Sequence, residues 1–469
     1  MSFPKYPEYK DSGVEWLGDV PAHWQVKRMR FVATLNPSKS EIRHLPDTRE
    51  VSFIPMEAVG EEGSLDLSQA RPLGSVIDGY TYFSEGDVTF AKITPCFENG
   101  KGAIMRNLRD GIGFGTTELT VARPETSQVT GDYLYRVISS RPFRELGESH
   151  MYGAGGQKRV PDDFLRNFGL AWPPISEQAL IAPFLDHETA RIDALVEEQQ
   201  RLIELLKEKR QAVISHAVTK GLAPGVPMKD SGVEWLGEVP AHWEIKQLKH
   251  VVNPATSITY GIVQAGPDYE GGVPYIKTSD MSGDELSLHG YSKTSPDVDR
   301  SYKRSKVSRG DVVVAIRATI GKCLKVPEGL GGANLTQGTA KVSPGEKVLS
   351  DFLLFSMRSN PTQSYFGEMA KGATFKEITL DSLRRTPIAL PPVAEQEAIV
   401  TRVANLIPNI DRLLVDAKKA VLLLQERRSA LISAAVTGKI DVRNWQGTAY
   451  DAYSEGEMLM AAEEHATYS

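Results

Sequence analysis

The chain repeats itself, and this duplication constrains its possible fold more than any other feature of the sequence. Residues 10–24 read KDSGVEWLGDVPAHW and residues 229–243 read KDSGVEWLGEVPAHW, so 14 of 15 positions are identical at an offset of 219. Further pairs recur at nearly the same offset: EGDV at 85–88 with RGDV at 309–312, PPISEQ at 173–178 with PPVAEQ at 391–396, and AVTKG at 217–221 with AVTGK at 435–439. A repeat this long exceeds any solenoid unit, which indicates tandem duplication of a domain-sized segment.

The two copies match at their edges and differ in their middles, since residues 25–172 and 244–390 diverge strongly. We therefore expect two variable domains on one shared frame. The predicted segments are a repeated stretch with the first variable domain (1–172), a helical spacer (173–222), a linker, the second repeated stretch and the second variable domain (223–390), a second helical segment (391–441), and a flexible acidic tail (442–469).

The shared frame is predicted to consist of two long helices. Each follows a Pro-Pro pair, which disfavours helix in the residue before it, and Ser176 is a suitable N-cap in the first copy. Apolar residues then recur at a spacing of three or four, which gives each helix one apolar seam. The predicted spacer residues of these seams are Leu185, Ile192, Leu195, Leu202, Leu206 and Val213, and then Val403, Leu406, Ile410, Leu413, Leu424 and Leu431.

A helix of about 40 residues spans roughly 60 Å, and a single seam of that length needs another helix to cover it. We therefore predict that the two helices form an antiparallel coiled coil. Two unrelated amphipathic core helices are the alternative. The variable domains are predicted as mixed strands and short helices, so the fold class is α/β (α+β) with pseudo-twofold symmetry.

Searches for catalytic motifs return nothing. The sequence holds no P-loop, no dinucleotide-type glycine loop and no adenine-methyltransferase tetrad, so we predict no catalytic and no metal-binding residue in this chain. His23 and His242 are interpreted as buried structural histidines, since no second ligand lies nearby. Two cysteines form neither a disulfide framework nor a zinc site, and no stretch approaches the length of a membrane-spanning helix. We expect a cytoplasmic protein that does not enter a membrane.

Local charge favours DNA binding although the whole chain carries a net charge of −6. Residues 293–325 hold nine Lys or Arg against three Asp, a local net charge of +6 that includes Arg304 and Lys306. Such a cluster is typical of a phosphate-binding surface, and a merely solvated basic face is the alternative. Two glycine-containing loops, 153–160 and 371–378, precede the long helices and present polar side chains. Each is either a DNA-contacting loop or an ordinary glycine turn.

The sequence resembles the specificity subunits of type I restriction-modification systems. The resemblance is carried by the duplicated SGVEWLG and VPAHW, by GDVVVAIRATIGK at 310–322, by GATFKEIT at 372–379, and by the LPPVAEQ and AVTGKID segments at 390–396 and 435–441. It implies two target-recognition domains, each reading half of a bipartite, asymmetric double-stranded DNA target. It also implies a coiled coil that acts as the spacer and docks two modification (methyltransferase) subunits, with restriction (translocase-nuclease) subunits beyond them.

The resemblance implies that S-adenosylmethionine, ATP and Mg²⁺ belong to the partner subunits and that this chain binds no cofactor of its own. It also indicates which loop residues meet DNA. Together with the basic cluster, the candidates are Lys92, Thr94, Lys101, Gln157, Lys158, Arg304, Lys306, Arg317, Thr319, Lys322, Thr374 and Lys376. A fused methyltransferase or nuclease would need motifs that are not visible. A stand-alone DNA-binding regulator and a methylation-only specificity subunit stay open as alternatives.

Overall fold

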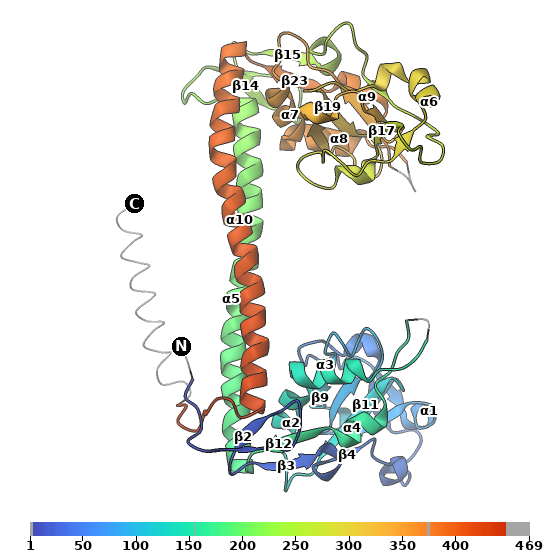
Figure 1. The fold of residues 1–469 in the computed structure, drawn as a ribbon, viewed down its shortest axis with the longest axis vertical. Helices are drawn as coiled ribbons and strands as arrows, with labels where there is room; N and C mark the ends of the chain where they lie inside the picture. Colours follow the sequence, from blue (N-terminus) through green and yellow to red (C-terminus); the bar gives the residue numbers. More distant parts are fainter. Residues whose placement is uncertain (1–2, 155, 373–375, 447–469) are drawn as a thin grey trace. The chain divides into compact units, whose positions relative to one another are not determined.

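The computed structural model describes residues 3–154, 156–372 and 376–446. The chain divides into two compact units, one of residues 1–198 with 420–469 and the other of residues 199–419, called unit 1 and unit 2 below. Each unit contains one variable domain, one copy of the repeated stretch and part of each long helix (Figure 1). The division therefore falls inside the two long helices, because each helix segment packs against the domain beside it.

The two long helices are α5 (Ile175–Lys220) and α10 (Val393–Val436), with 46 and 44 residues. In unit 1 the first part of α5 packs against the last part of α10, where Leu185 and Leu431 share one buried core. In unit 2 the last part of α5 meets the first part of α10, where Ile214 and Val403 are buried together. The helices thus pack against each other in each unit, and the predicted class of mixed strands and helices with a packed pair of long helices is confirmed.

The buried face of the helix pair follows a strict heptad. In α5 the shielded positions are 185, 189, 192, 196, 199, 203, 206 and 210, and in α10 they are 403, 407, 410, 414, 417, 421, 424, 428 and 431. Of the predicted seam residues, the structure buries Leu185, Ile192, Leu206, Val403, Ile410 and Leu431, and half-buries Val213, Leu406 and Leu424.

Three predicted seam residues lie off this register. Leu195, Leu202 and Leu413 are 47%, 41% and 50% exposed, whereas their neighbours Val196, Ile203 and Leu414 face the partner helix. The physical reason is that the heptad passes through Gln199 and Arg210, which are polar, so an apolar pattern alone selects the wrong neighbour.

The variable domain of unit 1 contains two four-stranded sheets. One has the order β6-β5-β10-β7 and the other β4-β11-β8-β9, and only β5 and β10 run parallel among the pairs in them. The strands are β4 (Ala33–Leu35), β5 (Glu50–Ile54), β6 (Ala70–Pro72), β7 (Thr81–Ser84), β8 (Val88–Ala91), β9 (Gly102–Ile104), β10 (Ile112–Gly115) and β11 (Leu119–Pro124). The helices are α1 (Leu73–Val76), α2 (Gly131–Ile138), α3 (Arg141–Ser149) and α4 (Asp162–Asn167).

The variable domain of unit 2 keeps the second of these sheets and changes the first. Its four-stranded sheet has the order β16-β22-β19-β20, and a three-stranded sheet has the order β18-β17-β21. The strands are β16 (Thr259–Tyr260), β17 (Val273–Ile276), β18 (Lys293–Thr294), β19 (Val312–Ala315), β20 (Cys323–Lys325), β21 (Asn334–Leu335) and β22 (Thr339–Val342). The helices are α6 (Pro296–Ser301), α7 (Ser350–Arg358), α8 (Asn360–Met369) and α9 (Leu380–Arg385), with a short 3₁₀ helix η7 (Lys303–Ser305).

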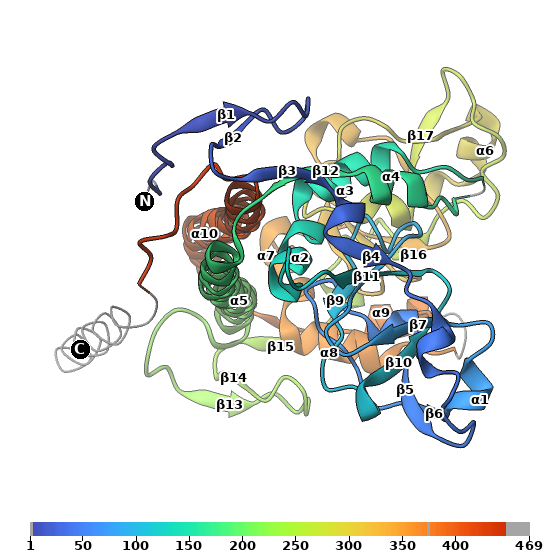
Figure 2. The same ribbon diagram turned by 90° about the horizontal axis from the view of Figure 1, so that it is seen from below.

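The repeated stretches form the same hairpin and ribbon in both units. In unit 1, β1 (Tyr9–Asp11) pairs with β2 (Asp19–Pro21), and β3 (Gln25–Arg28) pairs with β12 (Gly169–Trp172), as Figure 2 shows. In unit 2, β13 (Met228–Asp230) pairs with β14 (Glu238–Pro240), and β15 (Glu244–Gln247) pairs with β23 (Pro387–Leu390). Each variable domain therefore begins and ends on neighbouring strands next to a long helix.

Each repeated stretch is tied to the start of a long helix by one glutamate. The indole Nε1 of Trp24 donates to Glu177 at 3.0 Å, and Nε2 of His23 lies 2.8 Å from the same carboxylate. In unit 2, Trp243 and His242 make the matching contacts with Glu395 at 2.9 and 2.6 Å. Both tryptophans are fully buried. Both histidines contact a carboxylate, but their side chains are 41% and 45% exposed, so the prediction that they are buried is wrong.

No helix among the described residues is long and apolar enough to cross a membrane.

Candidate nucleic-acid interface

In unit 1 two predicted DNA-contacting loops lie side by side. The loop between β8 and β9 (residues 92–101) joins the segment before α4 through backbone hydrogen bonds. The amide of Thr94 donates to the carbonyl of Lys158 at 3.0 Å, and the amide of Val160 donates to the carbonyl of Lys92 at 2.9 Å. Lys92, Thr94 and Lys158, which are far apart in the sequence, are therefore brought together.

Unit 2 builds the same loop pair from different residues. The amide of Ile378 donates to the carbonyl of Ile316 at 3.0 Å, and Arg317 forms a β-bridge with Glu377. Beside this bridge lies an open depression of about 570 Å³. Its lining includes the predicted residues Thr319, Lys322 and Lys376. The structure thus assembles three of the unit 2 candidates on one surface.

Glycines end both loops because the chain must turn sharply there against a helix. Gly100 has φ 77° and Gly321 has φ 82°, a region that other residues avoid. A Cβ at Gly100 would lie 2.9 Å from the guanidinium of Arg144, and a Cβ at Gly321 would lie 2.5 Å from Oε1 of Gln363. Each loop therefore packs closely against a helix from later in its domain, α3 in unit 1 and α8 in unit 2.

Several candidate cations are already paired with carboxylates. Arg317 Nε lies 2.6 Å from Glu377, Lys322 Nζ lies 3.4 Å from Asp284, and Lys306 Nζ lies 2.6 Å from the buried Asp299. Lys101 donates from Nζ to the carbonyl of Met56 at 3.3 Å. These side chains are held in place by hydrogen bonds and ion pairs within the fold. To bind a DNA phosphate, each would have to break its present contact or contact both groups at once.

Other candidates are free to meet a ligand. Lys158, Arg304 and Lys376 are exposed and have no ion pair among the described residues. Gln157 and Thr319 are also exposed. Thr374 lies outside the described residues. Arg304 and Lys306 sit on or next to η7, which contacts β16 and β21, and neither lines the depression beside Lys376.

The basic cluster of residues 293–325 is less positive in the fold than in the sequence. Six of its nine cations have a carboxylate partner: Arg300, Lys306, Arg309, Arg317, Lys322 and Lys325. Four of these partners lie outside the cluster, at Glu328, Glu377, Asp284 and Asp351. A charge count over a window cannot include acids that only folding brings near.

One arginine in the unit 1 loop pair acts as a scaffold. Arg159 donates from Nε and a terminal nitrogen to both carboxylate oxygens of Glu118, at 2.9 and 2.7 Å. This hydrogen bonding is the main reason that the pKa of Glu118 lies below its ordinary value. Arg159 occupies the place that Glu377 holds in unit 2, since each forms both bridges of its loop pair. The two loop pairs therefore share a backbone and differ in charge.

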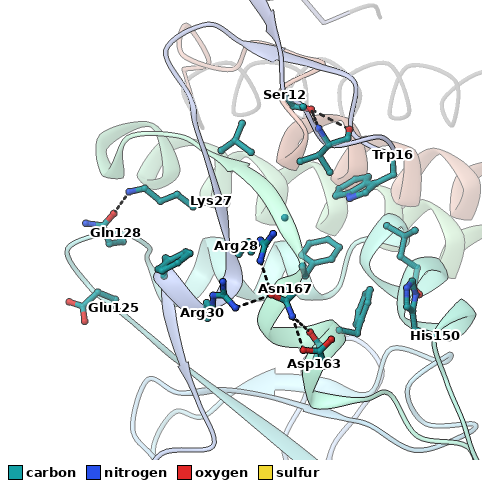
Figure 3. Close-up of a pocket in the computed structure, with 18 of the residues that line it drawn as sticks. Ser12, Trp16, Lys27, Arg28, Arg30, Glu125, Gln128, His150, Asp163 and Asn167 are labelled. Atoms are coloured by element: carbon teal, nitrogen blue, oxygen red, sulfur yellow. Dashed lines mark hydrogen bonds between the residues drawn. The ribbon is translucent and has the colours of Figure 1, made fainter.

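Sequence reasoning missed two features of unit 1. Tyr152 is 68% exposed and bridges Arg159, so its ring is available for stacking on a base. In the sequence, Tyr152 stands directly before the glycine-rich run GAGG at 153–156, and this pattern could have indicated an exposed aromatic residue. The second feature is an open depression of about 1220 Å³ that none of the predicted residues lines (Figure 3).

The walls of this depression carry cations held by neutral groups. Arg28 and Arg30 both donate to Oδ1 of Asn167, at 3.1 and 3.0 Å, and Lys27 donates to Oε1 of Gln128 at 2.6 Å (Figure 3). None of the three cations has an ion pair within the described part of the chain, although Glu125 and Asp163 also line the depression. The KRMR run at 27–30 was the signal for these further phosphate-binding candidates.

Part of the chain is similar to known DNA specificity proteins. Residues 240–420 match the family described as the Type I restriction modification DNA specificity domain. The type I restriction enzyme EcoEI specificity subunit of Escherichia coli is 40% identical over 189 residues, which are 40% of this chain and 31% of that protein. The matched part of the chain is similar to type I specificity subunits. The chain spans about a third of the length of this relative.

Solved structures share the fold over nearly the whole chain. A chain from a structure of complex assembly and conformational transition in the type I R-M system superposes with a TM-score of 0.71 at 18% identity, covering 89% of this chain and 98% of that one. The HsdS subunit from Thermoanaerobacter tengcongensis superposes with a TM-score of 0.54 at 16% identity, with the same coverage. At these identities the likeness concerns the fold.

Proposed function

We propose that this chain is a type I specificity subunit that recognises a bipartite, asymmetric double-stranded DNA target, with one recognition domain for each half. The observation that carries the proposal is that the same backbone loop pair is built twice from different side chains, at residues 92–101 with the described residues of 152–160 and at 316–322 with the described residues of 371–378. A shared scaffold with different contact residues suits two surfaces that read two different short sequences.

In this proposal the loop residues divide between two tasks. The exposed amines of Lys158 and Lys376 contact phosphates and position the duplex. Gln157 and Thr319, also exposed, hydrogen-bond to base edges, and Tyr152 supplies an aromatic face. The chain binds and measures DNA, and the chemistry is assigned to other subunits.

Those subunits dock on the outer faces of the long helices. Apolar side chains off the heptad are exposed along both helices: Leu195, Leu202, Leu205, Leu413, Val415, Leu422 and Leu423. Exposed apolar side chains gathered on one element indicate a protein interface. We assign this face to two modification subunits that bring S-adenosylmethionine, and we place restriction subunits, with ATP and Mg²⁺, beyond them.

Methylation mapping tests the proposal. The chain is co-expressed with a modification subunit from the same genome, and N6-methyladenine is mapped across the host genome with and without this chain. A bipartite motif that appears only when the chain is present supports the specificity function and reveals both half-sites. A stable complex that methylates no new motif would contradict it and favour a stand-alone DNA-binding regulator.

A further inference from the structure

The same arginine contact occurs in both units at equivalent positions of the two long helices. Arg210 of α5 places Nε 2.8 Å from Asp411 of α10, and Arg428 of α10 places Nε 2.7 Å from Asp193 of α5. The two arginines are 218 residues apart, and so are the two aspartates. The duplication has thus kept one cross-helix ion pair in each unit.

Each of these arginines also reaches a carboxylate of its variable domain. In unit 2 a terminal nitrogen of Arg210 lies 3.3 Å from Asp284, in the stretch after the 3₁₀ helix of residues 278–281. In unit 1 a terminal nitrogen of Arg428 lies 3.9 Å from Glu62, in a turn closed by the Gly60 amide and the Ser64 carbonyl. The surrounding sequences differ, GEEGS in one unit and SGDEL in the other, yet both supply an acid at this place.

The segments that carry Glu61, Glu62 and Asp284, called the acidic turns below, also contact the loops 92–101 and 316–322, called the recognition loops. In unit 1 the amide of Asn99 donates from Nδ2 to Glu61 at 3.0 Å. In unit 2 Nζ of Lys322 lies 3.4 Å from Asp284. A continuous path therefore leads from helix arginine to acidic turn to recognition loop in each unit, although the residues along it are different.

Unit 2 reinforces this path with a second arginine. Arg358, at the end of α7, donates to the carbonyl of Asp284 and to the carbonyl of Cys323, both at 2.8 Å, and its own carbonyl accepts from Gln211 of α5. Burial opposes the ionisation of Asp284, but the charges of Arg210, Lys322 and Arg358 outweigh it, so the pKa of Asp284 lies below its ordinary value. Asp284 is therefore a carboxylate at neutral pH.

The helix arginines are partly shielded, since their side chains are 20% and 23% exposed. Their carboxylate partners are more exposed, at 38% and 45% on the helices and 64% and 68% in the variable domains. A partly buried arginine shared between two carboxylates fixes geometry better than a solvent-exposed pair, which contributes little.

We propose that Arg210 and Arg428 are positioning residues that hold each recognition loop at a set place against the helix pair, through the acidic turns at Asp284 and at Glu61–Glu62. The proposal rests on the DNA-recognition function proposed above. Neither arginine contacts DNA in this arrangement. Loss of either one leaves the loop residues present but lets their position vary, so the penalty for a target with the wrong half-site spacing falls.

The test uses the full chain bound to its modification subunit. Arg210→Met and Arg428→Met are compared with Lys209→Met and Arg427→Met, which change exposed cations one residue away. The dissociation constant is measured for the mapped target and for targets with one base pair more or fewer between the half-sites. We expect the two positioning variants to lose about three- to tenfold of the discrimination between spacings, with an unchanged salt dependence, because no phosphate contact is removed. The controls keep the discrimination of the wild type.

A second measurement does not depend on DNA binding. In the free chain, amide hydrogen exchange in residues 316–322 should accelerate in Arg210→Met and in Asp284→Asn, and exchange in residues 92–101 should accelerate in Arg428→Met, with no change in the controls. Loop exchange and spacing discrimination equal to those of the wild type would overturn the positioning role. A wild-type complex that binds no DNA, together with accelerated exchange in the variants, would instead overturn the proposed function and leave the structural coupling standing.

Discussion

Glu177 and Glu395 anchor the two repeated stretches, but their surroundings differ. Glu177 is 6% exposed and accepts hydrogen bonds from His23, Trp24 and the hydroxyl of Tyr6. Glu395 is 42% exposed and accepts only from His242 and Trp243 among the described side chains. The difference arises because the first repeated stretch is preceded by a segment that carries Tyr6 over the glutamate.

This asymmetry predicts unequal effects of the same substitution. Glu177→Ala leaves buried donors of Tyr6 and Trp24 unsatisfied, so we expect it to lower the free energy of unfolding by about 2–4 kcal/mol. Glu395 is itself 42% exposed, so in Glu395→Ala water can take its place beside His242 and Trp243. We expect this substitution to lower the free energy of unfolding by about 1 kcal/mol. Urea unfolding followed by tryptophan fluorescence measures both, and equal losses in the two variants would contradict the proposed role of burial.

Arg304 and Lys306 were both predicted to contact DNA, but the structure gives them different surroundings. Arg304 is exposed and unpaired within the described residues, so Arg304→Ala should weaken DNA binding and lower the salt slope by about one counterion, without loss of stability. Lys306→Ala leaves the 6%-exposed carboxylate of Asp299 without its cation and should lower stability first. Binding titrations at several salt concentrations, with thermal unfolding in parallel, distinguish the two, and an unchanged slope for Arg304→Ala would mean that this face is only solvated.

At the scale of elements, the helix pair was predictable and its register was not. Length and the Pro-Pro starts follow from local sequence, and α5 and α10 confirm them. The prediction of Ser176 as N-cap is wrong, because α5 begins at Ile175 and Ser176 lies in its first turn. Whether Leu202 or Ile203 is buried depends on which face of α5 meets the other helix. That face includes polar residues such as Gln199, so the spacing of apolar residues alone does not identify it.

Neighbouring substitutions in α5 test this register. Ile203 is 8% exposed and Leu202 is 41% exposed. Ile203→Asp buries a charge in the seam, so we expect it to destabilise the chain by several kcal/mol. Leu202→Asp should leave the unfolding midpoint within a few degrees and weaken co-purification with the modification subunit, because it changes only the outer apolar face. If Leu202→Asp co-purified with the modification subunit as well as the wild type does, the exposed apolar face at Leu202 would not be part of the interface.

For the whole molecule, the proposal of one recognition domain in each unit predicts independent half-sites. Gln157→Ala changes only the unit 1 loop pair, and Thr319→Ala changes only that of unit 2; both side chains are exposed and are assigned to base edges. We expect each variant, in the co-expression experiment, to relax or weaken methylation with respect to one half of the motif and to leave the base preferences of the other half intact. If either variant altered both halves, the assignment of one domain to each half would fail.

The sequence by itself determined the duplication and the two long helices, because these depend on identity at a constant offset and on local periodicity. Tertiary structure alone decided which face of each helix is buried, which cations remain unpaired, and which distant loops meet. Lys322 illustrates the reason: its partner Asp284 lies 38 residues earlier in the chain, and only the fold brings the two charges within 3.4 Å. Local pattern specifies elements, whereas charge pairing and loop pairing are contacts between segments that the chain order does not specify.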